Sequence, residues 1–192
     1  MRHDFTISGP AYRLRPVEVD DAAFIVTLRT EPTRNRFIHY TPPDIEAQIN
    51  WIQRYLEQPG DYYFIVESVQ TGEREGTIGI YDIDPQQRTA EWGRWVIRPG
   101  SKAALQSLVL LFRLAFESLH LEVLRTHTVV ENRGVIAILE RAGMRRVRIL
   151  PKDVQIGQAQ HDTVEHQISR ADWLGGRAAG TGRFGTHNPA TT

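Results

Sequence analysis

The chain has 192 residues, and its 23 lysine and arginine residues balance 23 aspartate and glutamate residues, so the formal net charge is zero. This balance gives no reason to expect a nucleic acid or an anionic membrane as the main partner. Because the chain has no cysteine, disulfides, thiolate nucleophiles and cysteine zinc sites are excluded.

The composition predicts one soluble domain over residues 1–174, since 41% of the chain is hydrophobic. Residues 1–6 contain no apolar core of the kind that a signal peptide has. The most apolar run, 108–112, is far too short to cross a bilayer. We therefore expect a cytoplasmic protein without membrane contact. Residues 175–192, rich in glycine, alanine and threonine, predict a disordered tail.

The first half of the chain predicts a strand, two helices and a meander of three strands. Asp20 and Asp21 are suited to cap the first helix, and Asp44 is suited to cap the second. The expected strands cover 12–17, 62–68, 76–82 and 89–97, and the expected helices run from about 20 to 30 and from 44 to the Pro59-Gly60 pair.

The second half predicts a long, largely buried helix followed by shorter elements. Apolar side chains keep helical spacing from about Lys102 to Leu119, with only a narrow polar stripe. Gly143 is placed to end a shorter helix at the C′ position. The shorter helix is expected at 134–142, and strands at 122–130, 144–150 and 163–169. This order predicts an α+β fold around one central sheet.

The segment 91–104 is the most informative part of the chain, because it predicts a strand, a tight loop and the first turn of the long helix. The first amide groups of a helix have no partner within it and can bind phosphate. A carboxylate on the strand, Glu91, and an anion site at the helix start together indicate an enzyme that uses a phosphorylated cofactor.

Several stretches carry a resemblance to a known family. Residues 90–97 (AEWGRWVI) are similar to its fourth strand, and Arg98-Pro99 with the following loop stand where it has a pyrophosphate-binding motif. Residues 129–132 (VVEN) and 139–144 (LERAGM) resemble its asparagine, apolar helix and E-K/R-x-G-F ending. Over residues 11–170 the chain resembles the GNAT superfamily of acyl-CoA-dependent N-acyltransferases, in particular its RimJ/RimL-like and amino-sugar-modifying members.

The resemblance implies a three-layer α/β/α fold with a mixed, mostly antiparallel sheet, in which the fourth and fifth strands splay into a V. It implies acetyl-CoA as the acyl donor, with the pantetheine arm in the V and the pyrophosphate on the amides at the start of the long helix. The residues implied in binding acetyl-CoA are Val96, Ile97, Arg98, Lys102, Ala103, Ala104, Leu105, Gln106, Ser107 and Asn132.

The chain departs from the family pattern at two places. The phosphate loop usually reads Q/R-x-x-G-x-G/A, where glycine lets the backbone approach the phosphates, but here residues 102–107 read KAALQS. Many members also carry a tyrosine in the last helix that protonates the leaving thiolate, and Leu139 stands at the equivalent position. Water or another group must then supply that proton.

N-acylation needs a base, because a protonated amine has no lone pair with which to attack the thioester. Glu91 is the first candidate, with a solvated or salt-bridged strand residue as the structural alternative. His127 is the second candidate, although a lone histidine is more often a satisfied polar residue. Tyr81 and Asp82 border the same predicted cleft. Tyr81 is a candidate substrate-binding residue, although structural roles are the simpler interpretation for both. Positioning of the reactants can itself supply much of the rate.

Cationic and aromatic residues gather where related enzymes bind the acceptor. These candidate acceptor-binding residues, Arg29, Arg34, Arg36, His39 and Tyr40, are suited to hold a phosphate or diphosphate. The alternative for each arginine is an ordinary solvated side chain.

Regular pleating would place Trp92 and Arg94 on one face of their strand and Trp95 on the other, unless a bulge changes the phase. One tryptophan is expected in the core, and the other is available for stacking on a ligand. His161 and His166 are too poorly grouped for a metal site, and we expect none.

The leading hypothesis is an acetyl-CoA-dependent N-acetyltransferase for a primary amine of a small molecule, with an amino sugar, nucleotide-linked or not, as the favoured acceptor. A RimJ/RimL-like Nα-acetyltransferase for protein or peptide N-termini is one alternative. A degenerate GNAT fold that serves only as a binding module is another, motivated by Leu105 and by the missing tyrosine. The sequence is compatible with a monomer or a homodimer.

Overall fold

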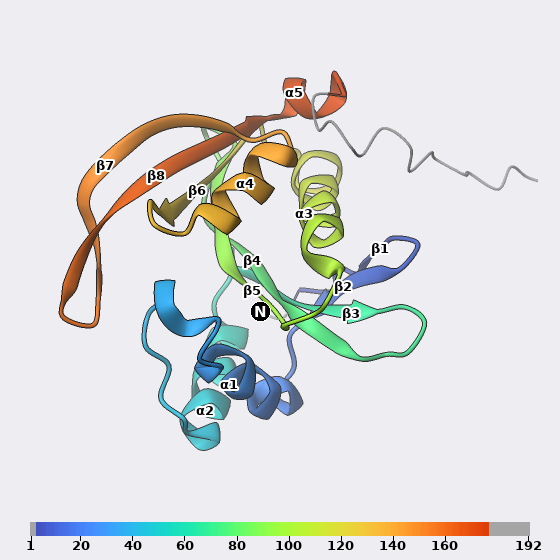
Figure 1. Ribbon diagram of the computed structural model, residues 1–192. Helices are drawn as coiled ribbons and strands as arrows, with labels where there is room; N and C mark the ends of the chain where they lie inside the picture. Colours follow the sequence, from blue (N-terminus) through green and yellow to red (C-terminus); the bar gives the residue numbers. More distant parts are fainter. Residues whose placement is uncertain (1–2, 177–192) are drawn as a thin grey trace, which may run out of the picture.

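The computed structural model describes residues 3–176 and contains an eight-stranded sheet with helices against both faces (Figure 1). The strands follow the order β1-β2-β3-β4-β5-β6-β8-β7, and every neighbouring pair is antiparallel except β5 and β6. The predicted mixed, mostly antiparallel sheet is therefore confirmed. The strands are β1 (Ile7–Ser8), β2 (Tyr12–Pro16), β3 (Tyr62–Ser68), β4 (Arg74–Asp84), β5 (Thr89–Ile97), β6 (Val123–Val129), β7 (Arg145–Ile156) and β8 (Ala159–Ser169).

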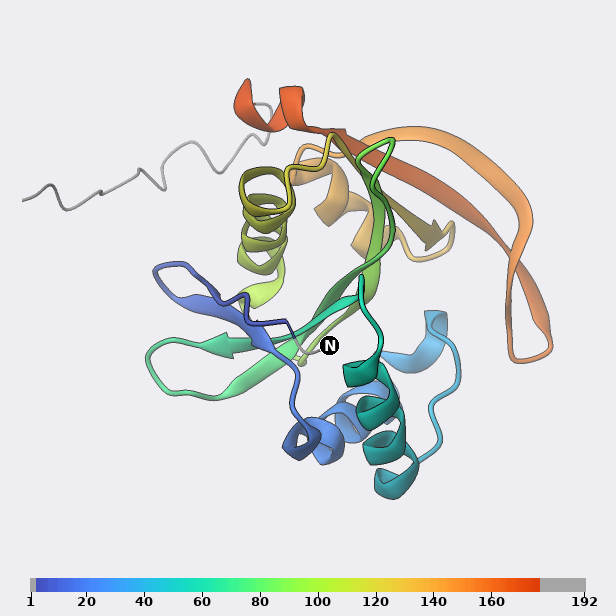
Figure 2. The same ribbon diagram turned by 180° about the vertical axis from the view of Figure 1, so that it is seen from behind.

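The helices form two layers, one on each side of the sheet (Figures 1 and 2). Buried residues of α1 and α2 form a smaller core with Tyr63 and Ile65 of β3. Those of α3 and α4 form the main core with alternate residues of the central strands. The helices are α1 (Ala22–Thr30), α2 (Ile45–Glu57), α3 (Ala103–Arg113), α4 (Arg133–Arg141) and α5 (Arg170–Leu174), with short 3₁₀ turns at Val19–Asp21 and Asn35–Phe37.

The predicted long helix changes its winding near its end. The α-helix stops at Arg113 and continues as one wider π turn, Leu114–Ser118, closed by the Leu119 amide on the Leu114 carbonyl. Leu114, Ala115 and Phe116 are all buried. A π turn rotates less per residue than an α-helix does. Three successive apolar side chains can therefore all point into the core.

The two acidic caps behave differently. Asp44 caps α2 as predicted, because its Oδ1 accepts the Ala47 amide at 3.0 Å. Asp21 makes no side-chain cap bond to α1. It is 1% exposed, pairs with Arg15 and Arg74, and accepts the Glu18 amide at 2.8 Å. The predicted cap at Asp21 is therefore wrong for α1, because two arginines bind the carboxylate inside the fold.

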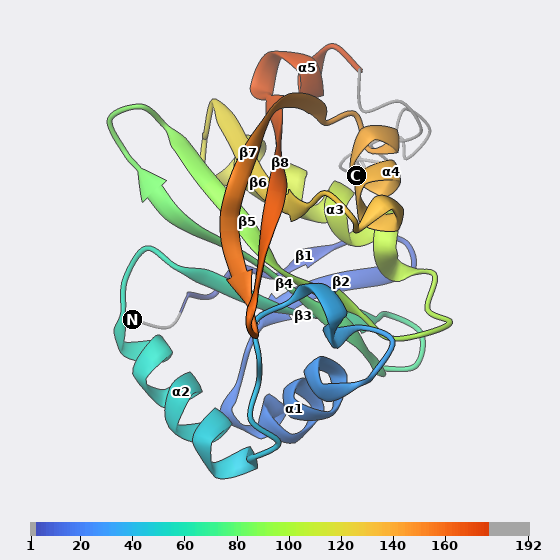
Figure 3. The same cartoon turned by 60° about the vertical axis from the view of Figure 1, so that its left-hand side comes forward.

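The last two strands extend well beyond their predicted bounds. They form one long hairpin with Gly157 in the turn, at φ 60°. Figure 3 shows this hairpin running across β5 and β6 toward the segment that follows α1. Residues 151–162 carry few apolar side chains, so their pattern did not predict strands. The predicted tail lies outside the described residues from 177 onward, and no helix within residues 3–176 combines the length and apolarity needed to span a bilayer.

The parallel pair β5–β6 separates soon after it begins. Its ladder joins only three residue pairs, from Thr89–Val123 to Glu91–Arg125. Beyond Glu91, β5 carries a bulge at which Arg94 takes φ 50°, and pairing with β4 resumes at Val96 opposite Thr77. The Thr77 hydroxyl donates to the Arg94 carbonyl at 2.7 Å, so the displaced backbone is satisfied. The predicted V between these strands is therefore present.

The close approach of β4 to β5 at the bulge generates a prediction about Gly76. A Cβ at this position would lie 2.4 Å from the Val96 carbonyl oxygen and 2.6 Å from Ile97 Cδ1. We expect Gly76→Ala to destabilise the fold by about 1–3 kcal/mol, because backbone must move to admit it. Gly134→Ala is the matched control, since nothing lies within 4 Å of its Cβ position. Urea unfolding that gave equal stability for both variants would contradict this view of the β4–β5 contact.

Candidate active site

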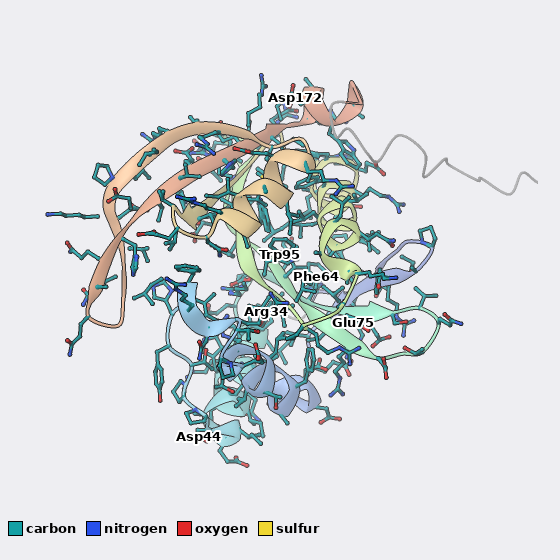
Figure 4. All side chains as sticks on the ribbon, in the orientation of Figure 1. Arg34, Asp44, Phe64, Glu75, Trp95 and Asp172 are labelled. Atoms are coloured by element: carbon teal, nitrogen blue, oxygen red, sulfur yellow. The ribbon has the colours of Figure 1, made fainter. Side chains whose placement is uncertain are left out.

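A cavity of about 550 Å³ lies where β5 and β6 have separated. It passes through the sheet, because Val135 and Leu139 of α4 line it from one side and Arg29 of α1 from the other. Trp95 stands in its wall, near the middle of the molecule between the two helical layers (Figure 4). A ligand inside can therefore reach side chains from both layers.

Glu91 and His127 meet in the wall of this cavity. They come from the two strands that separate, and His127 Nδ1 lies 3.3 Å from Glu91 Oε1. The Tyr81 hydroxyl, on β4, donates to the same oxygen at 3.5 Å. Both members of the Glu91–His127 pair remain about 30% exposed, with side-chain values of 31% and 28%. The structure thus brings together three residues that were predicted separately, in a place that solvent and ligands can reach.

The pair changes the acid–base properties of its surroundings. The hydrogen bond with Glu91 raises the pKa of His127 above its ordinary value, and burial opposes this less strongly. Glu165 and Asp153 add to the same direction through their charge. Burial, together with the charge of Glu91, raises the pKa of Tyr81. Tyr81 therefore stays protonated and acts as a hydrogen-bond donor.

The bulge in β5 decides which way its large side chains point. Trp92 and Trp95 both pack on the main core, with ring centroids 5.9 Å apart. Arg94 lies on the opposite face, over the rings of Trp51, Tyr63 and Tyr81. The phase expected from regular pleating is therefore wrong, because the extra residue at Arg94 shifts the alternation. Trp92 is the expected core tryptophan, at 2% exposure.

Arg94 is held more firmly than the sequence indicated. Its guanidinium binds both carboxylate oxygens of Asp61, at 2.5 and 2.7 Å. This bidentate pair joins β5 to the residue just before β3, and the side chain is only 26% exposed. Such a pair fixes orientation as well as position. It was missed because 33 residues separate its partners and no local pattern connects them.

The predicted acceptor residues divide into two groups. Arg29 and His39 line the cavity, and Arg29 Nε donates to Thr41 Oγ1 at 2.7 Å. Tyr40 lines a neighbouring hollow. Arg34 and Arg36 are exposed and line neither space, and the Arg36 guanidinium lies 4.9 Å from the centroid of its neighbour Phe37. Arg36 is therefore not placed to bind an acceptor here.

The tip of the β7–β8 hairpin supplies a wall that the sequence did not predict. Asp153, Val154 and Ile156 of β7 line the cavity together with Thr163 of β8. The Thr163 hydroxyl donates to Asp153 Oδ2 at 2.5 Å, which fixes the carboxylate. The alternation of Val154 and Ile156 is the one local sign of a strand here. Two apolar residues are too few to predict a strand from the sequence.

Comparison with known proteins identifies the family. The family model described as "Acetyltransferase (GNAT) domain" matches residues 12–145. The chain belongs to the GNAT acetyltransferase family. It is 25% identical over 174 residues to "Probable N-acetyltransferase YjcK" of Bacillus subtilis (strain 168), an alignment that covers 84% of this chain and 94% of that protein.

Solved structures show the same GNAT fold. A GCN5-related N-acetyltransferase from Brucella melitensis superposes with a TM-score of 0.82 at 20% identity, covering 97% of this chain and 88% of that one. A nucleotide-linked sugar GNAT named FdhC superposes at 0.76 with 23% identity, covering 91% and 96%. A chimera of the spermidine N-acetyltransferase SpeG from Vibrio cholerae and hSSAT also superposes at 0.76, with 21% identity, covering 85% and 98%.

GNAT acetyltransferases use acetyl-CoA as the acyl donor, and the V of this GNAT chain suits an extended ligand. Beyond Glu91 the edge of β5 that faces β6 has no strand partner among the described residues, and Val96 lines the cavity. Asn132 precedes α4 without capping it by a side-chain bond and also lines the cavity. The backbone amide of Asn132 donates to the Val129 carbonyl at 2.8 Å, whereas its side-chain amide makes no hydrogen bond to another residue in the described part of the chain. Leu139 is fully buried there, so α4 offers no hydroxyl at this point.

The start of α3 retains donors for an anion. The Ala103 amide donates to Ser101 Oγ at 3.1 Å. The amides of Ala104 and Leu105 follow in the first turn, where no helical carbonyl can reach them. Lys102 is exposed and has no ion-pair partner among residues 3–176. The Leu105 side chain packs on the main core, so its size is accommodated inside rather than over these amides.

The other predicted cofactor-binding residues of this region are engaged in structure to different degrees. Ser107 is fully buried, accepts the Trp95 indole N–H at 3.1 Å and donates to the Ala104 carbonyl at 2.9 Å. Arg98 pairs with two glutamates of β4 and the preceding turn, and Ile97 pairs with Gly76 on the β4 side. Gln106 is partly buried. The hydroxyl of Ser107 and the charge of Arg98 therefore have protein partners.

No metal centre is evident in the part of the chain that the structure describes. No group of three or more histidine, aspartate or glutamate side chains within residues 3–176 is arranged to hold a metal ion. His161 lies 3.7 Å from Glu131, and His166 is buried 3.6 Å from Glu140.

A double-mutant cycle tests the packing of Tyr81 against β5. A Cβ at Gly93 would lie 2.4 Å from the Tyr81 hydroxyl oxygen but 3.4 Å from ring atom Cζ. We expect Gly93→Ala to cost about 1–3 kcal/mol in wild type, and at least about 0.5 kcal/mol less in Tyr81→Phe, because the clashing atom is gone. Urea unfolding of the four proteins measures this, and strictly additive costs would show that the hydroxyl does not lie over Gly93.

Titration of His127 tests the pair directly. We expect Glu91→Gln to lower the pKa of His127, measured by NMR, because its largest raising cause is removed while burial remains. A histidine whose pKa is higher in the folded than in the unfolded protein stabilises the fold at pH values below its unfolded-state pKa. This stabilisation is lost as the pH rises through the folded-state pKa. Glu91→Gln should therefore destabilise more at about pH 5.5 than at about pH 8.5. Glu131→Gln is the control, and a His127 pKa unchanged by Glu91→Gln would refute the pairing.

Proposed function

We propose that this GNAT protein transfers an acetyl group from acetyl-CoA to a primary amine of a small molecule, with an amino sugar as the favoured acceptor. The observation that carries the proposal is the cavity through the sheet, with the Glu91–His127 pair in its wall. Acetyl-CoA would supply the electrophilic thioester carbonyl. The β5 edge, Asn132 and the amides at the start of α3 would hold it, with Lys102 supplying positive charge.

Residues of the chain itself remove the proton from the amine. The Glu91 carboxylate accepts it, directly or through one water, so that the nitrogen lone pair becomes free to attack. His127 orients this carboxylate from β6, and the Tyr81 hydroxyl does so from β4. A carboxylate fixed from two sides is suited to the role of general base, which also requires hydrogen-bond reach of the proton that it removes.

A second hollow offers a route by which that proton can be released. It has a volume of about 380 Å³, and Glu91 and His127 line it as well as the main cavity. Asp82, Arg125 and Glu165 form other parts of its wall. The pair therefore stands between a space suited to the reactants and a polar space beyond it. Proton release through the second hollow would not require the acetyl-CoA site to empty first.

The residues on the far side of the cavity support one class of acceptor. Arg29 and His39 favour a polar acceptor with an acidic substituent, and this supports a sugar derivative. The name of FdhC refers to nucleotide-linked sugars and that of SpeG to spermidine, so both acceptor classes are known on this fold. A peptide N-terminus remains the alternative enzyme substrate. A binding module without catalysis is the non-enzymatic alternative, and CoA binding without thiol release would favour it.

A thiol-release assay with acetyl-CoA and a panel of amino sugars, polyamines and peptides tests the proposal. We expect turnover with an amino sugar, and a fall in kcat/KM of about 10²-fold in Glu91→Gln, the lower end of what general-base catalysis supplies. The loss should fall mainly on kcat, because the base acts in the transition state.

Glu46→Gln is the matched control, since Glu46 is an exposed carboxylate in the first turn of α2. Binding of acetyl-CoA is checked separately by thermal shift, where ligand at about 100 times Kd adds about 2.7 kcal/mol of stability. Full turnover in Glu91→Gln across the pH range would remove Glu91 as the base. No thermal shift at millimolar acetyl-CoA would remove the acetyl-transfer function itself.

A further inference from the structure

A separate hollow of about 340 Å³ lies between α1, α2 and the segment that joins them. It shares two lining residues with the main cavity, Arg29 and Arg94, so the two spaces meet at these arginines. Both volumes fall in the range of small-molecule sites. One elongated molecule could therefore occupy both, with one end beside Glu91 and the other between the two helices.

The lining of this chamber carries three arginines, Arg29, Arg54 and Arg94, against one carboxylate, Asp44, which caps α2 through the Ala47 amide. Asp61 neutralises Arg94 through their bidentate pair. Arg29 instead bonds only to neutral oxygens, Thr41 Oγ1 at 2.7 Å and the His39 carbonyl at 3.4 Å, and has no carboxylate partner within residues 3–176. Arg54 is exposed at the same hollow. A partly buried guanidinium without a counter-ion, placed where two cavities join, is suited to bind an anionic group of a ligand.

The same chamber has an aromatic wall. Trp51 and Tyr63 line it, and Tyr40 stands at its edge with 79% of its surface exposed. Trp51 is held in place by stacking on Tyr55, with ring planes 2° apart. The ring of Tyr40 covers little of the protein itself, so it is free to cover a flat ligand. Stacking of a nucleobase on such a ring contributes about 1–3 kcal/mol.

The polar hollow on the other side of Glu91 is a weaker candidate for a charged extension of the acceptor. Its carboxylates are largely occupied, because Glu165 bonds to Arg148 and Gln167. Asp84 accepts two backbone amides of its own turn. A cationic chain such as a polyamine would have to compete with these bonds for the carboxylates. An anion that binds Arg29 would not have to displace a carboxylate, because Arg29 bonds only to neutral oxygens within residues 3–176.

We propose that the chamber between α1 and α2 binds a nucleoside diphosphate, with the diphosphate on Arg29 and the base against Tyr40. The sugar carried by the diphosphate would extend past Arg94 into the main cavity and present its amine to Glu91. This inference rests on the proposed acetyl transfer and adds to it a nucleotide site outside the acetyl-CoA site.

Calorimetric titration of the full chain with UDP and dTDP tests the proposal, in the absence and in the presence of saturating CoA. CoA contains a nucleotide, so prior saturation removes its own site from the measurement. We expect one site for UDP or dTDP that persists with CoA bound. Affinity should fall at least about tenfold in Arg29→Met, because a charge-assisted contact is lost. Arg34→Met, at an exposed arginine in the segment that follows α1 and outside the chamber, is the matched control and should bind as wild type.

Tyr40→Ala separates the base from the phosphates. It should weaken the binding of UDP or dTDP but leave the binding of inorganic pyrophosphate unchanged. Because Tyr40 is exposed, its substitution should not disturb folding. Retained CoA binding confirms that each variant is folded. Pyrophosphate binding as tightly as both nucleotides would overturn the proposal, and so would spermidine binding in their place. Absence of nucleotide binding while CoA binds would overturn it and leave acetyl transfer standing, whereas failure of CoA alone would count against acetyl transfer.

Discussion

The bulge at Arg94 is the constraint on which the rest of the site depends. A non-glycine residue at φ 50° costs conformational free energy, and here neighbouring groups stabilise it. Thr77 satisfies its carbonyl, and Asp61 binds its guanidinium with two hydrogen bonds. With the bulge in place, β5 continues to pair with β4 but no longer with β6. The cavity is the direct result of that change of partner.

The same bulge sorts the side chains of β5 between the two helical layers. It places Trp92 and Trp95 together on the α3 and α4 side, where Ser107 binds the indole of Trp95. It places Arg94 on the α1 and α2 side, among three aromatic rings. Because the cavity passes through the sheet, the donor and the acceptor can approach from opposite layers. Glu91 lies at the level where the two strands separate, and this is where the reacting groups would meet.

The two departures from the family pattern have structural explanations. The first turn of α3 tolerates Leu105 because that side chain packs against the main core. The glycine of the usual pattern serves close backbone approach, and a side chain directed to the interior leaves that approach open. Leu139 is fully buried in the wall of the cavity. Burial and the charge of Glu91 raise the pKa of Tyr81, which makes its hydroxyl a weaker acid than an ordinary tyrosine. A water molecule remains the simplest source of the proton for the leaving thiolate.

Local pattern was enough to predict most of the elements. The apolar spacing of α3, the Asp44 cap, the turns of the meander and Gly143 after α4 act over a few residues and are visible in sequence. Those elements, in their order, also indicated the sheet and the family. The π turn at Leu114–Ser118 was not predicted, because it has the same apolar composition as an α-helix and differs only in how it fits the core.

The chain by itself therefore determined most of its elements, its class of fold and two separate candidate bases, Glu91 and His127. Only the tertiary structure decided that these two side chains meet at 3.3 Å, that Arg94 pairs with Asp61 and that the β7–β8 tip closes the cavity with Asp153. It also separated Arg29, which lies at the junction of two cavities, from Arg34 and Arg36, which do not. The physical reason is that these contacts join residues distant in the chain, whose relative position depends on the bulge, the register and the packing of the whole sheet.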